Sequence, residues 1–249
     1  MTPHNSPCSQ TPPHVADEAR IRQVRRIFST ITARYDFLNH FLSAGRDVYW
    51  RRFLVRRLRF FKTRRLLDLA TGTGDVALEA ARAHPDIRVF GLDFAGPMLE
   101  AARPKIIQAG LADRIANLQG DALNLPFPAD HFDAVTVAFG IRNMPDRTRV
   151  LEEVRRVLIP GGGLSILEFT TPQGRLIRKL YFFYLNQVLP RLAKLFTHNP
   201  EAYQYLAESI LHFPYPDVFL KEIARAGFAE AEKFPLTGGI TYLYEGKRV

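Results

Sequence analysis

Three acidic residues stand at or directly after the ends of successive apolar runs in the sequence. Asp75 follows Gly72 and Gly74 after the first run, Asp93 ends the second, and Asp121 follows the third. Carboxylates accept hydrogen bonds from hydroxyl and amino groups and attract cations. A single acid in such a place serves equally well as a helix cap or a surface ion pair. Three of them favour one shared ligand site.

A strand–turn–helix unit must position the first acid. Residues 66–70 are a nearly continuous apolar run, interrupted by Asp68, that is typical of a parallel strand covered on both faces. Gly72 and Gly74 permit a sharp turn and a close approach of the backbone to a ligand. Asp75 is expected to cap the helix that starts at Val76. Ligands of open α/β sheets bind at such junctions.

The remaining chain alternates between predicted strands and helices. Strands are expected over 66–70, 87–93, 115–118, 132–139, 164–169, 229–234 and 240–246, and helices over 75–84, 96–108, 147–158 and 217–226. Residues 160–163, Pro-Gly-Gly-Gly, are expected to form a turn. This alternation with short connections predicts right-handed βαβ units, and hence an α/β fold with a Rossmann-like, doubly wound, mostly parallel seven-stranded sheet.

Three ligand classes compete for the glycine-rich turn. A phosphate-binding P-loop needs a lysine after its last glycine, but Asp75 stands there. A dinucleotide would bring its pyrophosphate to the helix start, where the Asp75 charge would repel it. S-adenosylmethionine carries an ammonium, a sulfonium and a ribose diol, which suit acids. Asp93 does not discriminate, because an acid at this place also binds the ribose of NAD.

The composition and the N-terminal sequence indicate which disulfides, metal sites and cellular compartment can be expected. The 249 residues have a formal charge of +9 and one cysteine, Cys8, so no intramolecular disulfide and no cysteine-based metal site can form, and no metal is expected. Residues 1–13 lack the apolar segment of a signal peptide, and no apolar run is long enough to span a membrane, so the cytoplasm is the expected compartment. Residues 1–17 are expected to be disordered.

The segments that flank the predicted sheet are apolar and basic. Residues 18–63 are expected to form a helical cap with helices over 19–31 and 48–58. Residues 175–196 form a long stretch that fits either an interfacial helix or an ordinary cover helix. The charge also fits a nucleic acid, but residues 139–142, Phe-Gly-Ile-Arg, replace the Asn/Asp-Pro-Pro-Tyr/Phe tetrapeptide that amino-group methyltransferases use on flipped bases. We expect peripheral association with an anionic membrane rather than nucleic-acid binding.

Several stretches together resemble a known family. Residues 67–75, 91–93 and 120–127 resemble class I S-adenosylmethionine-dependent methyltransferases. Residues 28–50, 139–143, 160–169 and 203–210 are more specific: they resemble the quinone-biosynthesis C-methyltransferases, namely the demethylmenaquinone and 2-polyprenyl-6-methoxy-1,4-benzoquinol methyltransferases. The resemblance runs from about Val24 to the C-terminus. It implies one methyltransferase domain over 18–249, with a cofactor core over 64–170, a substrate- or membrane-facing helical insertion over 171–215, and closing elements over 216–249.

The resemblance also implies the site residues. Thr73, Asp93, Asp121 and Ala122 match the family's cofactor-binding positions, and cofactor binding is also expected at Asp68, Gly72, Gly74 and Ala138. Three positions differ from the usual family residue. Asp121 stands where Asn is frequent, Ala138 where some members have Ser, and Thr71 where Gly is usual, which demands a permitted φ at residue 71.

The implied reaction is methylation of a ring carbon of a polyprenylated quinol, most simply demethylmenaquinol to menaquinol. Arg142 is the expected electrostatic partner of the phenolate, with a structural pair to Asp146 as the alternative, and Tyr205 is expected to position the ring. Further candidates are His40, Glu168, Glu208 and His212. A methyltransferase for another lipophilic or nucleic-acid substrate and a dinucleotide-dependent oxidoreductase remain alternatives. The sequence leaves open which quinol is methylated and whether the chain forms a homo-oligomer.

Overall fold

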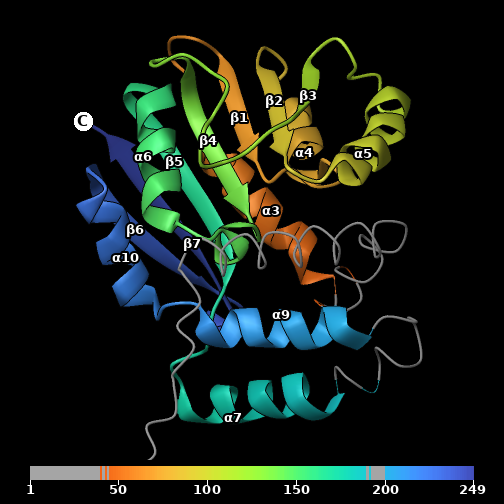
Figure 1. Ribbon diagram of the computed structural model, residues 1–249, viewed down its shortest axis with the longest axis vertical. Helices are drawn as coiled ribbons and strands as arrows, with labels where there is room; N and C mark the ends of the chain where they lie inside the picture. The colour runs from red at the N-terminus through yellow and green to blue at the C-terminus, as the bar shows by residue number, and fades with distance from the viewer. Residues whose placement is uncertain (1–39, 41–42, 44, 189–190, 192–199) are drawn as a thin grey trace, which may run out of the picture.

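The centre of the molecule is a seven-stranded sheet with the order β3-β2-β1-β4-β5-β7-β6 (Figure 1). The computed structural model describes residues 40, 43, 45–188, 191 and 200–249. All neighbouring strands are parallel except β7, which is antiparallel to both β5 and β6. The predicted mostly parallel seven-stranded sheet is therefore confirmed. The strands are β1 (Arg65–Leu69), β2 (Arg88–Asp93), β3 (Ile115–Gln119), β4 (Phe132–Ala138), β5 (Leu158–Phe169), β6 (Phe228–Leu236) and β7 (Thr241–Arg248).

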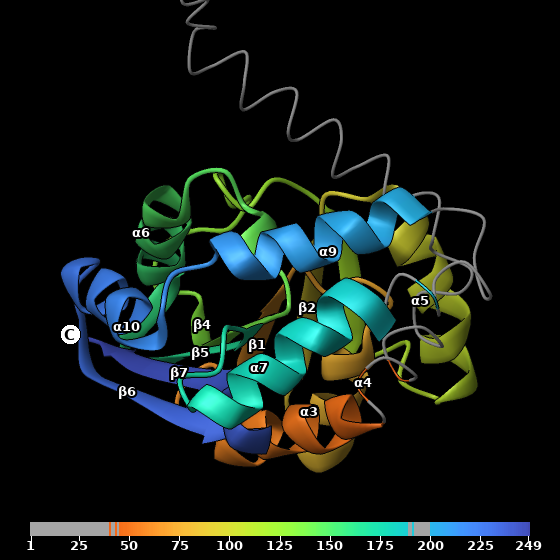
Figure 2. The same cartoon turned by 90° about the horizontal axis from the view of Figure 1, so that it is seen from below.

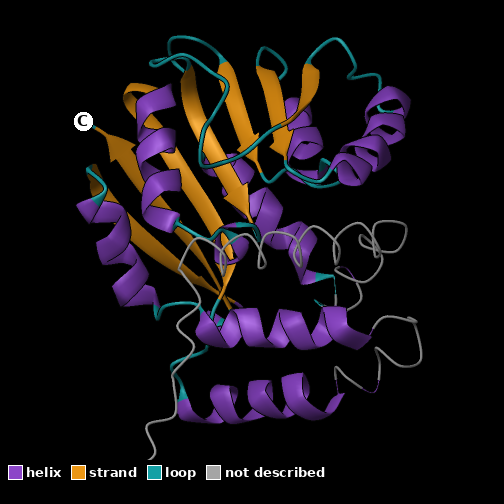
Figure 3. Ribbon diagram, in the orientation of Figure 1, coloured by secondary structure: helices purple, strands orange, loops and turns teal. Residues whose placement is uncertain are grey.

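Helices cover both faces of the sheet (Figures 1 and 3). One apolar core joins the sheet to α3 (Arg46–Arg57), α4 (Asp75–Ala83) and α5 (Gly96–Gln108). A second core joins it to α6 (Arg147–Val157) and α10 (Pro216–Arg225). Successive β1 side chains alternate between these cores, because Leu66 belongs to the first and Leu67 to the second. This explains why the strand has apolar residues on both faces and is nearly continuously apolar, with Asp68 as the interruption.

The predicted turn over 160–163 lies within the bounds of β5. The β4–β5 pairing passes from Phe132 with Leu158 to Ala134 with Gly163, so residues 159–162 leave the ladder, and Gly161, at φ 80°, permits this excursion. One local prediction is wrong. Asp75 does not cap α4. Gly74 is the N-cap, at φ 82°, and Asp75 is the first helical residue, whose side chain makes no capping hydrogen bond.

Two helices form a layer beyond the sheet. The parallel strands point their carboxyl ends toward α9 (Pro200–His212), and α7 (Arg175–Phe183) lies outside α9 (Figures 1 and 2). The inner face of α7 packs through Tyr181 and Leu185, which lies in the following π-helical turn, against Ile210 of α9. The predicted helix over 48–58 is found as α3. The predicted disorder over 1–17 and helix over 19–31 lie outside the described residues.

Candidate functional site

A cavity of about 350 Å³ opens at the carboxyl ends of β1 to β4. Five of the predicted site residues line it: Gly72, Asp93, Asp121, Ala122 and Ala138. The other predicted positions, Asp68, Thr73, Gly74, Arg142 and Tyr205, lie outside its wall. The wall also includes residues that sequence reasoning missed: Phe94, Met98, Gln119, Asn143 and Met144.

Asp93 is held rigidly at the end of β2. Its carboxylate accepts hydrogen bonds from the backbone N–H groups of Gly72 and Ala95, each at 2.9 Å. Burial raises the pKa of the Asp93 carboxyl group, and the two amides oppose that rise. A carboxylate offers about four lone-pair positions, so acceptor capacity remains for ligand hydroxyl groups. The bond to Gly72 also ties the glycine-rich turn to the second strand.

Asp68 supports the site from inside the sheet. Its carboxylate accepts hydrogen bonds from the hydroxyl groups of Thr71, at 2.6 Å, and Thr136, at 2.7 Å. The residue is buried, and burial raises the pKa of its carboxyl group to about 6, against the effect of both hydroxyl groups. Asp68 therefore joins β1, the turn and β4, rather than lining the cavity.

Two non-glycine residues in the left-handed region shape the cavity floor. Ala70 follows β1 at φ 55°, and Phe139 follows β4 at φ 58°. Such conformations cost free energy and cluster at functional sites. The turns approach closely, because a Cβ on Gly140 would lie 2.6 Å from the Ala70 Cβ. The φ angle that needs a special conformation is therefore at Ala70, not at its neighbour Thr71. The Thr71 hydroxyl instead donates a hydrogen bond to Asp68.

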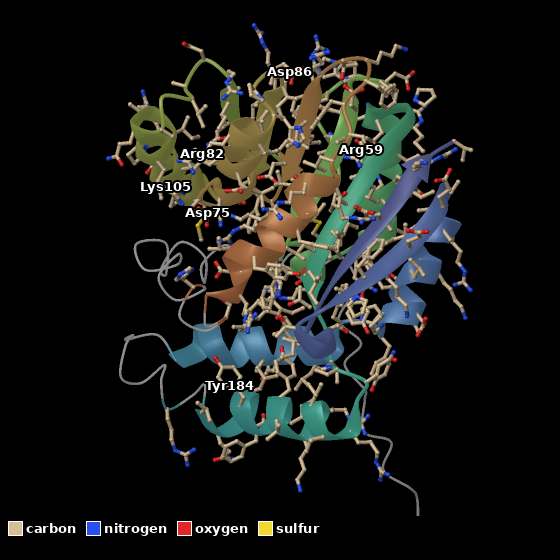
Figure 4. The ribbon with its side chains drawn as sticks, turned by 180° about the vertical axis from the view of Figure 1, so that it is seen from behind. Arg59, Asp75, Arg82, Asp86, Lys105 and Tyr184 are labelled. Atoms are coloured by element: carbon tan, nitrogen blue, oxygen red, sulfur yellow. The ribbon has the colours of Figure 1, made fainter. Side chains whose placement is uncertain are left out.

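Asp75 has cationic partners within the chain. Its carboxylate pairs with Lys105 of α5 and, at 3.2 Å, with Arg51 of α3. Figure 4 shows Asp75 and Lys105 side by side. Lys105 also donates a hydrogen bond to the Thr73 hydroxyl at 3.3 Å. In this structure the Asp75 carboxylate thus joins α3, α4 and α5, and its charge is balanced by Lys105 and Arg51 rather than left for a cationic ligand.

Asp121 closes the turn after β3. Its carboxylate accepts a hydrogen bond from the backbone N–H of Leu123 at 2.9 Å, and the side chain is exposed at the rim of the cavity. Ala122 and Leu123 stand beside it in the wall. A polar edge with apolar neighbours can bind a flat heteroaromatic ring that carries an amino group.

The cavity wall after β4 is a short 3₁₀ helix, η2 (Ile141–Asn143), which is anchored from behind. The buried Arg142 guanidinium donates to Glu168 at 2.6 Å, to the Phe139 carbonyl at 2.6 Å and to the Ser209 hydroxyl at 3.3 Å. Burial raises the pKa of the Glu168 carboxyl group, and the Arg142 charge opposes that rise. The alternative partner Asp146 is not used: Asp146 caps α6.

The remaining candidates divide between this wall and the surface. The Tyr205 hydroxyl donates a hydrogen bond to Asn143 Oδ1 at 3.0 Å, which brings α9 against η2. His40 pairs with Asp47 at 3.1 Å, and the His212 ring bonds to the Glu208 carbonyl at 2.7 Å. His40, His212 and Glu208 are absent from the cavity wall.

Comparison with known proteins shows which family the chain belongs to. Residues 14–248 match the family described as the ubiE/COQ5 methyltransferase family. The chain belongs to that family. It is 44% identical over 227 residues to the ubiquinone/menaquinone biosynthesis C-methyltransferase UbiE of Geotalea daltonii, covering 91% of this chain and 96% of the relative. It is 46% identical over 222 residues to the demethylmenaquinone methyltransferase of Thermus thermophilus, covering 89% and 100%.

Solved structures support the fold class. A methyltransferase of Thermotoga maritima, described as S-adenosylmethionine-dependent, superposes with a TM-score of 0.63 at 19% identity, covering 90% of this chain and 99% of that one. The predicted family, enzyme class and methyl donor, S-adenosylmethionine, are confirmed. Family membership also decides against the dinucleotide-dependent oxidoreductase.

The cavity fits the adenosyl part of this donor. Asp93 retains acceptor capacity for the two ribose hydroxyl groups, and Asp121 for an amino group on the adenine ring. Leu92, Phe94 and Met98 provide apolar surface between them.

Proposed function

We propose that the chain transfers the methyl group of S-adenosylmethionine to a ring carbon of a polyprenylated quinol, most simply demethylmenaquinol. The names of the relatives support the acceptor, and the observation that carries the proposal is the two-ended cavity. One end holds the acids of β2 and β3, and the other is the largely apolar wall after β4. A donor bound at the first end leaves the second for an apolar ring.

Aromatic side chains back the acceptor end. Phe139 lines the cavity, and its ring centroid lies 4.6 Å from that of Phe169, which in turn is 5.8 Å from Trp50 of α3. Trp50 is fixed by a hydrogen bond from its indole N–H to the Thr237 hydroxyl at 2.9 Å. Rigid aromatic faces stack favourably against a flat ring. They also exclude water from the place where the methyl group moves.

The chain's own residues orient the two reactants rather than form a covalent intermediate. S-adenosylmethionine supplies the activated methyl group when it is bound. Asp93 and Asp121 would hold the adenosyl part, and η2 would limit where an acceptor ring can lie. Arg142 and Tyr205 are proposed to act on the acceptor through η2, because the guanidinium is bound to Glu168 and the phenol to Asn143.

The test is methyl transfer from labelled S-adenosylmethionine to two short-tailed quinols, a demethylnaphthoquinol and a 6-methoxy-1,4-benzoquinol that lacks the ring methyl group, under anaerobic conditions. We expect label on a ring carbon, identified by mass spectrometry and NMR. Label on a ring oxygen, or none on either quinol from protein that binds S-adenosylhomocysteine, would overturn the proposal. The ratio of the two rates assigns the preferred ring.

We also infer that α7 docks the enzyme on an anionic membrane, where a polyprenylated acceptor resides. Its outer face exposes Leu176, Leu180 and Phe183, which are 72%, 60% and 60% exposed. Three exposed bases, Arg175, Arg178 and Lys179, accompany them. Apolar residues with flanking bases are typical of a helix that lies in the membrane interface. No helix among the described residues has the length and apolar character to cross a bilayer.

Membrane docking is tested by cosedimentation with phosphatidylcholine vesicles, with and without phosphatidylglycerol. Replacing Arg175, Arg178 and Lys179 with Gln should weaken binding about 100-fold, since each base near an anionic surface contributes about 1 kcal/mol. The matched control replaces Arg82, Arg88 and Arg103 with Gln, which removes the same charge from exposed sites on α4, β2 and α5. Figure 4 shows Arg82 far from α7. Equal loss in both variants would contradict docking through α7.

A further inference from the structure

The cavity wall that follows β4 carries one hydrogen-bonding side chain. This part of the wall consists of Ala138, Phe139, Gly140, Asn143, Met144, Pro145 and Val150. Of these, only Asn143 has a polar side chain. The charged side chains of the wall, Asp93 and Asp121, lie at β2 and β3, on the other side of β1. Among the residues that the structure describes, Asn143 is therefore the side-chain partner that this part of the wall offers to a polar atom of a ligand.

Tyr205 determines how the Asn143 amide is oriented. The Tyr205 hydroxyl donates its proton to Asn143 Oδ1, so the amide nitrogen occupies the opposite arm of the planar group. Within the described part of the chain, Asn143 Nδ2 has no hydrogen-bond partner. A buried side-chain nitrogen without a partner would leave an unsatisfied buried atom, and Nδ2 is not one of these, so it is accessible. An accessible, oriented donor in a cavity wall is a preorganised binding group.

The backbone that carries Asn143 is also fixed. Its N–H donates to the Gly140 carbonyl at 3.0 Å, and the preceding residue, Arg142, is bound to Glu168 and Ser209. These contacts tie η2 to β5 and α9. The amide donor is thus held from two sides, and its position does not depend on a ligand.

We propose that Asn143 Nδ2 donates a hydrogen bond to the ring oxygen next to the carbon that receives the methyl group. This inference rests on the proposed function, because it requires a hydroxylated aromatic acceptor. The ring hydroxyl loses its proton to solvent and becomes a phenolate, whose charge is shared with the neighbouring ring carbon. A donor at the oxygen favours the charged form and raises the fraction of reactive acceptor at neutral pH.

The transfer then balances without a further reactant. The ring carbon supplies the electron pair of the new carbon–carbon bond, and the pair of the broken sulfur–carbon bond stays on sulfur. The methylated ring carbon loses its proton to water, which restores the aromatic ring. Asn143 neither gains nor loses a proton in these steps.

The test is the pH profile of kcat, measured anaerobically at saturating short-tailed demethylnaphthoquinol, in the Asn143→Leu variant of the full chain, because kcat reports ionisation of the bound acceptor. We expect a loss of about 10- to 100-fold at neutral pH, the usual effect of one hydrogen bond to a charged group. The rising limb of the profile should move up by about one to two pH units, so that the variant recovers at alkaline pH. The affinity for S-adenosylhomocysteine should not change.

The shift can be assigned to the acceptor because the variant preserves the surrounding ionisable groups. These are Asp93 on β2, Asp121 on β3, Tyr205 on α9, and the Arg142–Glu168 pair behind η2. Asn143→Asp keeps an oxygen for Tyr205 but places an anion beside the phenolate, so its loss should be at least as large. Tyr205→Phe should produce a smaller shift in the same direction, because it removes only the orienting contact.

Two results would overturn the inference. One is an Asn143→Leu profile that keeps the wild-type pH dependence and only falls in height, which indicates a packing role. The other is an Asn143→Asp variant as active as the wild type. If the wild type methylates neither quinol, the proposed function fails first, and the inference fails with it.

Discussion

The two ends of the cavity are built in different ways. At β1 and β2, each bond joins residues close in sequence or on adjacent strands: Thr71 to Asp68, and Gly72 and Ala95 to Asp93. The wall after β4 is instead held by contacts between distant segments. Arg142 reaches Ser209 across 67 positions, and Tyr205 reaches Asn143 across 62.

This difference suggests which parts of the fold determine specificity for the methyl donor and which determine specificity for the acceptor. The β1–β3 end, to which we assign the donor, follows from the generic strand-turn geometry, and a distant structure at 19% identity shares that fold. The β4 end, to which we assign the acceptor, depends on α7 and α9 lying over the carboxyl ends of the strands (Figures 1 and 2). A change in those helices can therefore alter the acceptor and leave the donor in place.

The largest expected effect on stability comes from the buried ion pair of the acceptor end. Glu168→Ala leaves the Arg142 charge buried without this partner and should lower the free energy of unfolding by about 3–5 kcal/mol in urea titrations. The control is Glu222→Ala, which removes the partner of Arg147 from a partly exposed pair and should cost about 1 kcal/mol or less. Equal losses would mean that burial of the Arg142–Glu168 pair has no special importance.

A somewhat smaller, pH-dependent effect is expected at the donor end. The pKa of Asp68 rises from 3.8 to about 6 on folding, so the folded state binds more protons than the unfolded state between these values. The wild type should therefore lose stability relative to Asp68→Asn as pH rises from about 4 to 6.5, by about 3 kcal/mol in total. The difference should be constant above pH 7. Urea titrations at several pH values measure it, and a difference that does not vary with pH would contradict the burial of the charge.

The smallest expected effect concerns the contact between the two ends. A Cβ at Gly140 would lie 2.6 Å from the Ala70 Cβ, so Gly140→Ala should cost about 1–3 kcal/mol and weaken both donor and acceptor binding. Gly174→Ala is the control, because its Cβ would meet nothing within 4 Å and its φ is −67°. That variant should change stability by less than about 1 kcal/mol. If Gly140→Ala behaves in the same way, the two turns are not coupled.

The sequence predicted which strand-end residues meet at the β1–β3 end of the cavity, because the signals for them are local. Apolar runs that end in glycines and acids place Gly72, Asp93 and Asp121 at one edge of a parallel sheet. The role of each residue was harder to predict from the sequence. Asp75 was assigned to a ligand, yet it pairs with Lys105 and Arg51 from two other helices. No sequence period or spacing predicts such contacts.

The acceptor end could not be assembled from the sequence for the same reason. Glu168 and Tyr205 were both candidates, but their partners, Arg142 and Asn143, are known only once β5 and α9 are placed. Asn143 lay inside a stretch that resembled the family and carried no signal that separated it from its neighbours. Its role depends on an accessible amide nitrogen, which is a property of the folded wall.

The central claim is that donor and acceptor are bound by separate groups at the two ends of one cavity. Calorimetric titration with S-adenosylhomocysteine tests it most directly when Asp93→Ala and Asn143→Leu are compared with the wild type. Loss of the charged partner of two ribose hydroxyl groups should weaken binding about 100-fold in Asp93→Ala, whereas Asn143→Leu should bind as the wild type does. Wild-type affinity in Asp93→Ala, or equal weakening in both variants, would contradict the claim.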